Sequence, residues 1–160
     1  MTTRLAKAGL AGALLIALCW PGTAWADVDF GLRGGVYTDT EEPFIGGEIL
    51  FPIGSSFYLN PNLEYVLIDN GDLYTVNLDF HYDFWGDRNL AAWLGAGAAL
   101  IRTELDPPRG RDRGVDETDF GVNLLAGIGA KRGTLRPYLQ GKVILSDDTE
   151  AVIAVGLRFP

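Results

Sequence analysis

Residues 73–84 have a strict two-residue period, and this period constrains the fold of the chain more than any other feature. Hydrophobic or aromatic residues occupy every second position, and the residues between them are mostly polar. The pattern is typical of a β-strand with one apolar and one polar face. The apolar positions are Tyr74, Val76, Leu78, Phe80, Tyr82 and Phe84, and the alternate positions are Leu73, Thr75, Asn77, Asp79, His81 and Asp83.

Seven further segments resemble this one and are separated by short stretches rich in turn residues. No segment after Asp27 has a helical period, and Asn70-Gly71 is a strong hairpin signal. The sequence therefore predicts an all-β domain of eight antiparallel strands. The expected strands are residues 28–38, 44–53, 57–68, 73–84, 90–105, 118–131, 135–145 and 151–159.

The N-terminal 26 residues have the pattern of a secretion signal. Arg4 and Lys7 precede an uncharged run over residues 10–20, and Ala24 and Ala26 are spaced as at a cleavage site. The run is shorter than the roughly 20 residues that a membrane-spanning helix needs. We predict a signal peptide at 1–26 that is removed before Asp27. A lipoprotein signal at Cys19 is the alternative, which the bulky residue before that cysteine disfavours.

Removal of the signal peptide changes the composition in two informative ways. Residues 27–160 contain no cysteine, which excludes disulfides and thiolate sites from the mature protein. The first 26 residues hold two of the 13 basic residues and none of the 21 acidic ones, so the net charge falls from −8 to −10. Such an acidic chain is not expected to bind nucleic acid.

The amount of apolar surface decides which kind of barrel the strands form. A soluble eight-stranded barrel turns its apolar face inward, where only a packed core or one small ligand fits. The apolar faces of these strands are too large for that space, so we expect them to contact lipid. The fold class predicted for residues 27–160 is an eight-stranded antiparallel up-and-down transmembrane β-barrel. A soluble periplasmic ligand-binding barrel is the alternative.

The connections between strands indicate the orientation in the membrane. In transmembrane barrels both chain ends are periplasmic, so the first, third, fifth and seventh connections should be external. They include the longest, residues 106–117, and these loops with their flanks hold 14 of the 21 acidic residues. Aromatic residues should form belts at the two membrane surfaces. The expected belts are Phe30, Phe51, Phe57, Phe84, Trp85, Trp93, Tyr138 and Phe159 on the periplasmic side and Tyr37, Phe44, Tyr65, Tyr74 and Phe120 on the outer side.

Three sequence features carry a family resemblance: Ala24-Trp25-Ala26, the Leu-Gly-Ala-Gly-Ala run at 94–98, and Val-Gly-Leu-Arg-Phe at 155–159. With them, the chain resembles the small outer-membrane barrels of the OmpA/OmpX type and the opacity-like surface proteins. The resemblance implies a bacterial outer-membrane location, contact with outer-membrane lipids, and recognition of the terminal strand by the barrel assembly machinery. Two features depart from the family pattern: Pro160 follows the terminal Phe159, and Pro61 lies inside the third strand.

The polar faces of the strands supply charges of both signs to the barrel interior. Pairing between these charges would satisfy them and close the narrow lumen. A plugged barrel is therefore expected, and a narrow porin for ions or small solutes is the alternative. The predicted lumen charge network consists of Arg33, Glu48, Glu64, Asp79, His81, Lys142 and Arg158.

His81 is the only histidine, and inward carboxylates beside it could orient it as a general base. A nucleophile would have to lie within hydrogen-bond reach. The serines, Ser55, Ser56 and Ser146, are all at turns, and the His-x-Ser spacing of the outer-membrane lipid A deacylases is absent. We therefore predict no catalytic residues and no enzymatic activity, with a lipid-modifying enzyme as the less favoured alternative.

The longest loop carries three alternating arginines, Arg109, Arg111 and Arg113. Arginines so presented can bind phosphates or carboxylates of a surface glycolipid or a protein ligand. No loop matches a defined ion-binding motif, so we predict no metal site and no cofactor. The sequence thus predicts a monomeric barrel with a structural or surface-interaction role.

Overall fold

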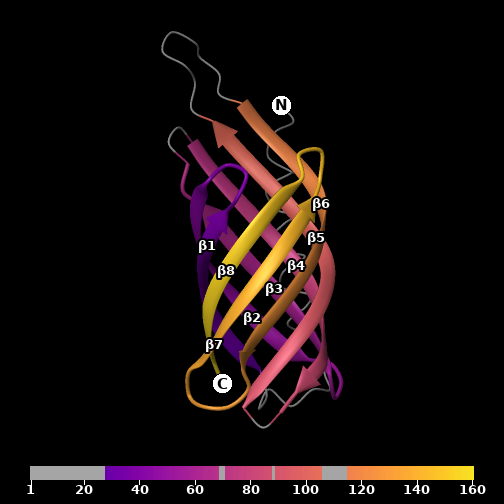
Figure 1. Ribbon diagram of the computed structural model, residues 1–160. Coiled ribbons are helices and arrows are strands. Elements are labelled where there is room, and N and C mark those ends of the chain that lie inside the picture. Colours follow the sequence, from indigo (N-terminus) through magenta and orange to yellow (C-terminus); the bar gives the residue numbers. More distant parts are fainter. Residues whose placement is uncertain (1–27, 69–70, 88, 106–114) are drawn as a thin grey trace, which may run out of the picture.

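The computed structural model describes residues 28–68, 71–87, 89–105 and 115–160. The fold is a closed barrel of eight antiparallel strands, each paired with its neighbours in sequence and β1 paired with β8 (Figure 1). The predicted fold class is therefore confirmed. The strands are β1 (Asp29–Tyr37), β2 (Glu42–Pro52), β3 (Phe57–Val66), β4 (Gly71–Gly86), β5 (Leu90–Leu105), β6 (Val115–Ala130), β7 (Arg136–Leu145) and β8 (Glu150–Phe159).

The start of β1 and the finish of β8 lie at the same end of the barrel, since Phe30 of β1 pairs with Phe159 of β8. We call this the lower end and the opposite one the upper end, as they stand in Figure 1. The predicted order of strands is correct, but several boundaries were wrong. β2 begins at Glu42, β3 ends at Val66, and β4 extends from Gly71 to Gly86. The Asn70-Gly71 turn falls partly outside the described residues.

The barrel wall is uneven in height because β4, β5 and β6 have 16 residues each, whereas β1 has 9 and β7 and β8 have 10. β6 was expected to begin at residue 118, but Val115 already pairs with Leu105. β7 pairs with β6 only from Val122 downward. The β5–β6 hairpin therefore rises above the rim, and no described strand pairs with the β7-facing edge of residues 115–121 (Figure 1).

A β-bulge interrupts the lower part of β4. Asp83 pairs with Trp93 but Trp85 pairs with Ala92, so Phe84 is an extra residue in this strand. A bulge breaks the alternation of side chains between the two faces. As a result, Phe84 and Trp85 are adjacent in sequence and both exposed on the outside.

Pro61 lies in the middle of β3 without a shift in register. It pairs with Leu78 of β4, whereas the β2 ladder breaks at the position opposite Ile49. Proline has no N–H to donate to that neighbour. The side-chain amide of Asn60 donates instead to the Ile49 carbonyl oxygen at 3.0 Å. A neighbouring side chain thus replaces the missing ladder bond.

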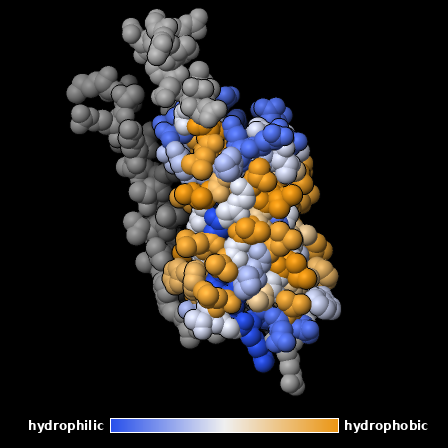
Figure 2. Space-filling view, turned by 60° about the vertical axis from the view of Figure 1, so that its left-hand side comes forward, coloured by the Kyte–Doolittle hydropathy of each residue, from blue (hydrophilic) through white to orange (hydrophobic). Residues whose placement is uncertain are grey.

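The outer surface is largely apolar. Apolar side chains cover most of the face in Figure 2, and hydrophilic ones gather at its upper and lower ends. Leu32, Leu78 and Leu124 are about half exposed although they lie in mid-strand. Large exposed apolar surface is unfavourable in water and favourable against lipid. The described residues include no helix long and apolar enough to cross a membrane.

Four of the expected belt aromatics were assigned to the wrong face. Tyr37, Phe44, Trp93 and Tyr138 are buried inside the barrel. Each occupies an inward position of its strand, so the side-chain alternation overrides the general preference of aromatics for membrane surfaces. Phe30, Phe57, Tyr74, Phe84, Trp85 and Phe120 are exposed outside, as a belt requires.

Candidate functional site

The barrel interior is packed with side chains that form three successive layers. An apolar layer lies toward the upper end, a charged and polar layer lies in the middle, and an aromatic layer lies below it. A pocket follows at the lower end. All seven residues of the predicted lumen set lie inside and are buried.

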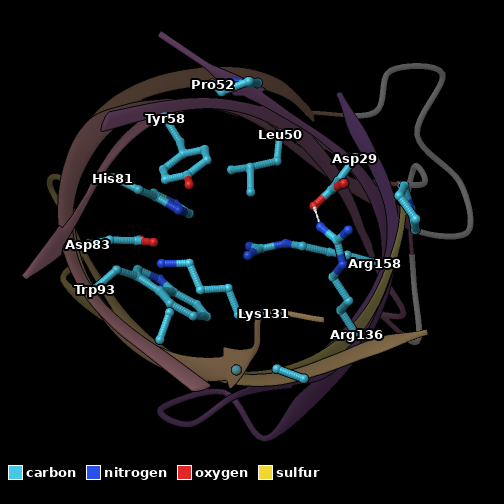
Figure 3. Close-up of a pocket in the computed structure, with 14 residues that line it drawn as sticks. Asp29, Leu50, Pro52, Tyr58, His81, Asp83, Trp93, Lys131, Arg136 and Arg158 are labelled. Carbon is cyan, nitrogen blue, oxygen red and sulfur yellow. Dashed lines mark hydrogen bonds and ion pairs between the residues drawn. The ribbon is translucent and has the colours of Figure 1, made fainter. Parts of the chain in front are cut away.

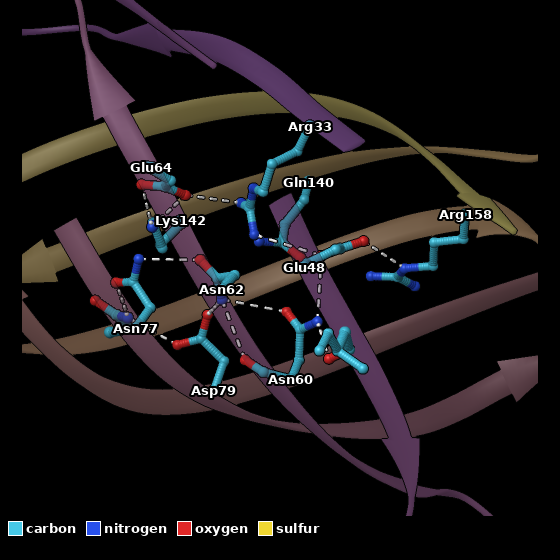
Figure 4. A network of polar contacts seen from close by, with 12 residues as sticks. Arg33, Glu48, Asn60, Asn62, Glu64, Asn77, Asp79, Gln140, Lys142 and Arg158 are labelled. Atoms are coloured by element: carbon cyan, nitrogen blue, oxygen red, sulfur yellow. Dashed lines mark hydrogen bonds and ion pairs between the residues drawn. The ribbon is translucent and has the colours of Figure 1, made fainter. Parts of the chain in front are cut away.

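The centre of the middle layer is Glu64, whose side chain is fully buried. The ammonium group of Lys142 donates to both of its carboxylate oxygens at 2.9 Å, and the Tyr37 hydroxyl donates to one of them at 2.7 Å. Arg33 completes the group, with a guanidinium nitrogen 3.1 Å from Glu64 (Figure 4). Two cations from different strands therefore share one carboxylate.

Glu48 organises the lower part of the same layer. Nε of Arg158 donates to it at 2.7 Å, and Nη1 of Arg33 lies 3.5 Å away. The Asn60 amide donates to the same carboxylate at 3.2 Å. Arg33 thus lies between the two glutamates and links them electrostatically (Figure 4). A charge buried to this extent is stable only when it is paired.

Asp79 is the one carboxylate of the predicted set that forms no ion pair with a described residue. It accepts instead from the side-chain amides of Asn62 at 2.9 Å and Asn123 at 2.7 Å. Asn77 donates to Asn62 at 3.0 Å and accepts from Asn123 at 2.8 Å. The four side chains form a closed hydrogen-bonded ring between β3, β4 and β6. The prediction did not assign the asparagines to the network, although they occupy inward positions.

The upper layer is a cluster of buried apolar and aromatic side chains. Its buried members pack above the ion pairs and span β1, β2, β3, β5, β7 and β8. Phe44 and Tyr37 form an edge-to-face pair with ring centroids 5.6 Å apart. The remaining members are Val66, Ala99, Ile144, Val152 and Ala154.

The lower layer is built from stacked rings. His81 lies parallel to Trp93 with centroids 5.9 Å apart, and the Arg158 guanidinium covers the Tyr138 ring at 4.3 Å. Small residues in the wall make room for these rings: a Cβ at Gly127 would collide with the Trp93 indole. Rings from β4, β5 and β7 therefore pack against one another inside the barrel.

The structure places His81 in the lower part of the barrel, at the same end as two of the three serines. No described hydrogen bond joins its imidazole to a hydroxyl, and its Nε2 atom has no partner there. The Ser146 hydroxyl donates to the Asp148 carbonyl at 2.6 Å in the upper turn, at the other end of the barrel from His81. Ser55 and Ser56 lie in the lower turn between β2 and β3.

Two other site predictions concern loops. Arg109, Arg111 and Arg113 lie outside the described residues. In the described part of the chain no three histidine, cysteine or acidic side chains are grouped as a metal site.

This protein is similar to known proteins in its structure, but no match was found from its sequence. No family model and no curated protein matches the sequence. Among solved structures, Neisserial surface protein A (NspA) has a TM-score of 0.56 and 14% identity, covering 82% of this chain and 93% of that one. The outer membrane enzyme PagL has a TM-score of 0.56 and 13% identity, covering 82% and 99%.

Ail, the attachment invasion locus protein of Yersinia pestis, is similar to the same extent. Its TM-score is 0.57 and its identity 8%, with 82% of this chain and 93% of that chain covered. Ail has also been solved in complex with the heparin analogue sucrose octasulfate. The chain thus has the fold of small eight-stranded outer-membrane barrels, a fold that occurs in surface proteins and in an enzyme.

Proposed function

We propose that this protein is a non-enzymatic barrel of the bacterial outer membrane, closed to solutes, that contacts ligands at the cell surface through its upper end. The observation that carries the proposal is the contrast between the two parts of the molecule. Buried ion pairs cross the lumen, which supports a closed barrel, whereas the β5–β6 hairpin rises above the rim with a strand edge that no described strand pairs.

Membrane location is supported by the outer surface and by the fold. The exposed mid-strand leucines and the aromatic residues near both ends are arranged as in proteins of this architecture. Strands of 9–16 residues are long enough to cross a bilayer when tilted. The proposal includes the removal of residues 1–26 as a signal peptide. It also includes recognition of β8 by the barrel assembly machinery.

A closed lumen is supported by the charges in the middle layer. Three cations, Arg33, Lys142 and Arg158, are matched by three carboxylates, Glu48, Glu64 and Asp79. Opening a path would separate the ion pairs of Glu48 and Glu64 in a low-dielectric interior, which costs several kcal/mol per uncompensated ion. The apolar layer above them is a second barrier to ions.

A surface-contact role is supported by the upper hairpin. An unpaired strand edge offers backbone donors and acceptors to an added strand. The sequence between β5 and β6 includes Arg109, Arg111 and Arg113, whose guanidinium groups suit phosphate or sulfate. Because the structurally similar Ail has been solved with a sulfated saccharide, we propose anionic saccharides as one ligand class.

Conductance tests the closed lumen. The refolded protein is inserted into a planar bilayer, and heat-dependent gel migration verifies that it has folded. We expect no discrete current steps from the inserted barrel. Steps whose ion selectivity changes in Glu64→Gln would contradict the proposal and identify a narrow porin.

Titration with sucrose octasulfate tests the contact surface. We expect saturable binding that is lost when Arg109, Arg111 and Arg113 are all changed to serine. A second variant joins the paired residues Ile101 and Asp119 by an Asn-Gly turn, which removes residues 102–118 and with them most of the raised edge. Equal binding by the native protein and both variants would show that the hairpin is not the contact surface.

A further inference from the structure

The lower end of the barrel contains a pocket, which lies below the packed layers of the lumen. Its volume is about 310 Å³, and the lower ends of all eight strands contribute to its lining. His81, Asp83 and Trp93 project from one side of the barrel wall, and Arg158 reaches toward them from the other side (Figure 3). A volume of this size is at the lower end of the range for small-molecule sites.

Two deeply buried side chains on the lining of this pocket each have a nitrogen atom without a hydrogen-bond partner among the described residues. Arg158 is 7% exposed and donates through Nε to Glu48, but its Nη2 atom has no hydrogen-bond partner among the described residues. His81 is 1% exposed, and its Nε2 atom is unpartnered in the same way. Buried polar atoms without partners are rare in native proteins because each costs about 1–3 kcal/mol.

The charges that line the pocket are not all paired with one another. Asp29 and Arg136 form an ion pair with each other at 2.7 Å, so their charges are already matched. Lys131 and Asp83 remain, and no ion pair of the described residues includes either of them. The pocket therefore offers two cationic donors, Lys131 and Arg158, and one carboxylate, Asp83, which both cations attract without a close ion pair.

We infer that this pocket binds a small zwitterionic solute, such as an amino acid or a dipeptide, from the aqueous space below the barrel. The ligand carboxylate accepts hydrogen bonds from Arg158 Nη2 and the Lys131 ammonium group, and the ligand ammonium group faces Asp83. Leu50 and the Trp93 ring supply apolar contact for the remainder of the ligand. A ligand with only one charge leaves one side of the pocket without a counterion.

The single histidine makes the test direct. Its imidazole resonances are followed by NMR in the intact protein in detergent micelles, because every histidine signal comes from His81. The probes are alanyl-alanine, acetate and methylammonium. We expect alanyl-alanine to shift the resonances saturably and to bind at least tenfold more tightly than either singly charged probe.

Variants on the two sides of the pocket separate the two charges. Lys131→Gln should weaken binding of alanyl-alanine about tenfold, as the loss of one charged hydrogen bond predicts. Asp83→Asn should weaken alanyl-alanine but leave acetate unchanged. Arg132→Gln is the matched control, since Arg132 is the neighbouring basic residue and lies outside the pocket lining.

Three results would overturn the inference. The first is no saturable shift with any probe. The second is acetate binding as tight as that of alanyl-alanine, which would give Asp83 no role. The third is equal weakening in Lys131→Gln and Arg132→Gln, which would reflect surface charge alone.

Discussion

The buried charges of the middle layer depend on one another residue by residue. Lys142→Met removes the ammonium group that donates to Glu64 and leaves that carboxylate with Arg33 and the Tyr37 hydroxyl. The middle layer then holds three carboxylates and two cations. One uncompensated buried charge costs about 3–5 kcal/mol, so we expect a loss of that order in the free energy of unfolding. Denaturant titration of the protein in lipid vesicles measures it. The double variant Glu64→Gln/Lys142→Met should lose less, and an equal loss would mean that the pair is not coupled.

Single glycines determine whether the large lumen rings fit. In Gly127→Ala the new methyl group meets the Trp93 indole, whereas nothing lies within 4 Å of a Cβ at Gly141. Overpacking costs about 1–3 kcal/mol, and alanine in an open strand position stabilises by about 0.5–1 kcal/mol. Gly127→Ala should therefore lower the denaturant midpoint and Gly141→Ala should raise or preserve it. Matching losses in both variants would contradict the packing explanation.

Among the elements, β3 tolerates its proline through the preceding asparagine. Asn60→Ala leaves the Ile49 carbonyl without its donor and should cost about 1–3 kcal/mol. Pro61→Thr restores a backbone N–H at the position opposite Ile49. In that background the cost of Asn60→Ala should be smaller, although loss of its bond to Glu48 persists. A double-mutant cycle of unfolding free energies measures this difference, and additive costs would rule out the replacement.

The turn between β4 and β5 depends on a carboxylate. The backbone N–H groups of Asn89 and Leu90 donate to Asp87 at 2.6 and 2.8 Å, and these bonds lower the pKa of Asp87 below its ordinary value of 3.8. A lowered pKa in the folded state stabilises the protein above pH 3.8, and this stabilisation is lost as the pH falls through the folded pKa. The difference in denaturant midpoint between the native protein and Asp87→Ala should therefore be constant near neutral pH and shrink in acid. A difference that is independent of pH would exclude the carboxylate as its source.

The strands show what the sequence could and could not predict. Two-residue periodicity identified all eight strands and the inward residues of the charge network, because alternation alone assigns a face. The bulge at Phe84 was missed, since its sequence alternates normally up to that point. Trp93 and Tyr138 were assigned by residue type to the membrane surface. In the two-residue alternation Trp93 lies on the same face as Gly95, and Tyr138 lies on the same face as Lys142. Alternation alone would therefore have placed both rings inside.

At the scale of the whole molecule, the apolar belt separates a membrane barrel from a soluble one. Leu78 lies outward at the middle of β4 and is 52% exposed, whereas Leu135 lies in the lower turn and is 55% exposed. An arginine facing lipid costs about 2–4 kcal/mol at the bilayer midplane and about 0–1 kcal/mol near the interface. Leu78→Arg should therefore destabilise the protein in lipid vesicles far more than Leu135→Arg. Since both side chains are equally exposed, equal losses would mean that depth in a bilayer is irrelevant and would favour a barrel surrounded by water.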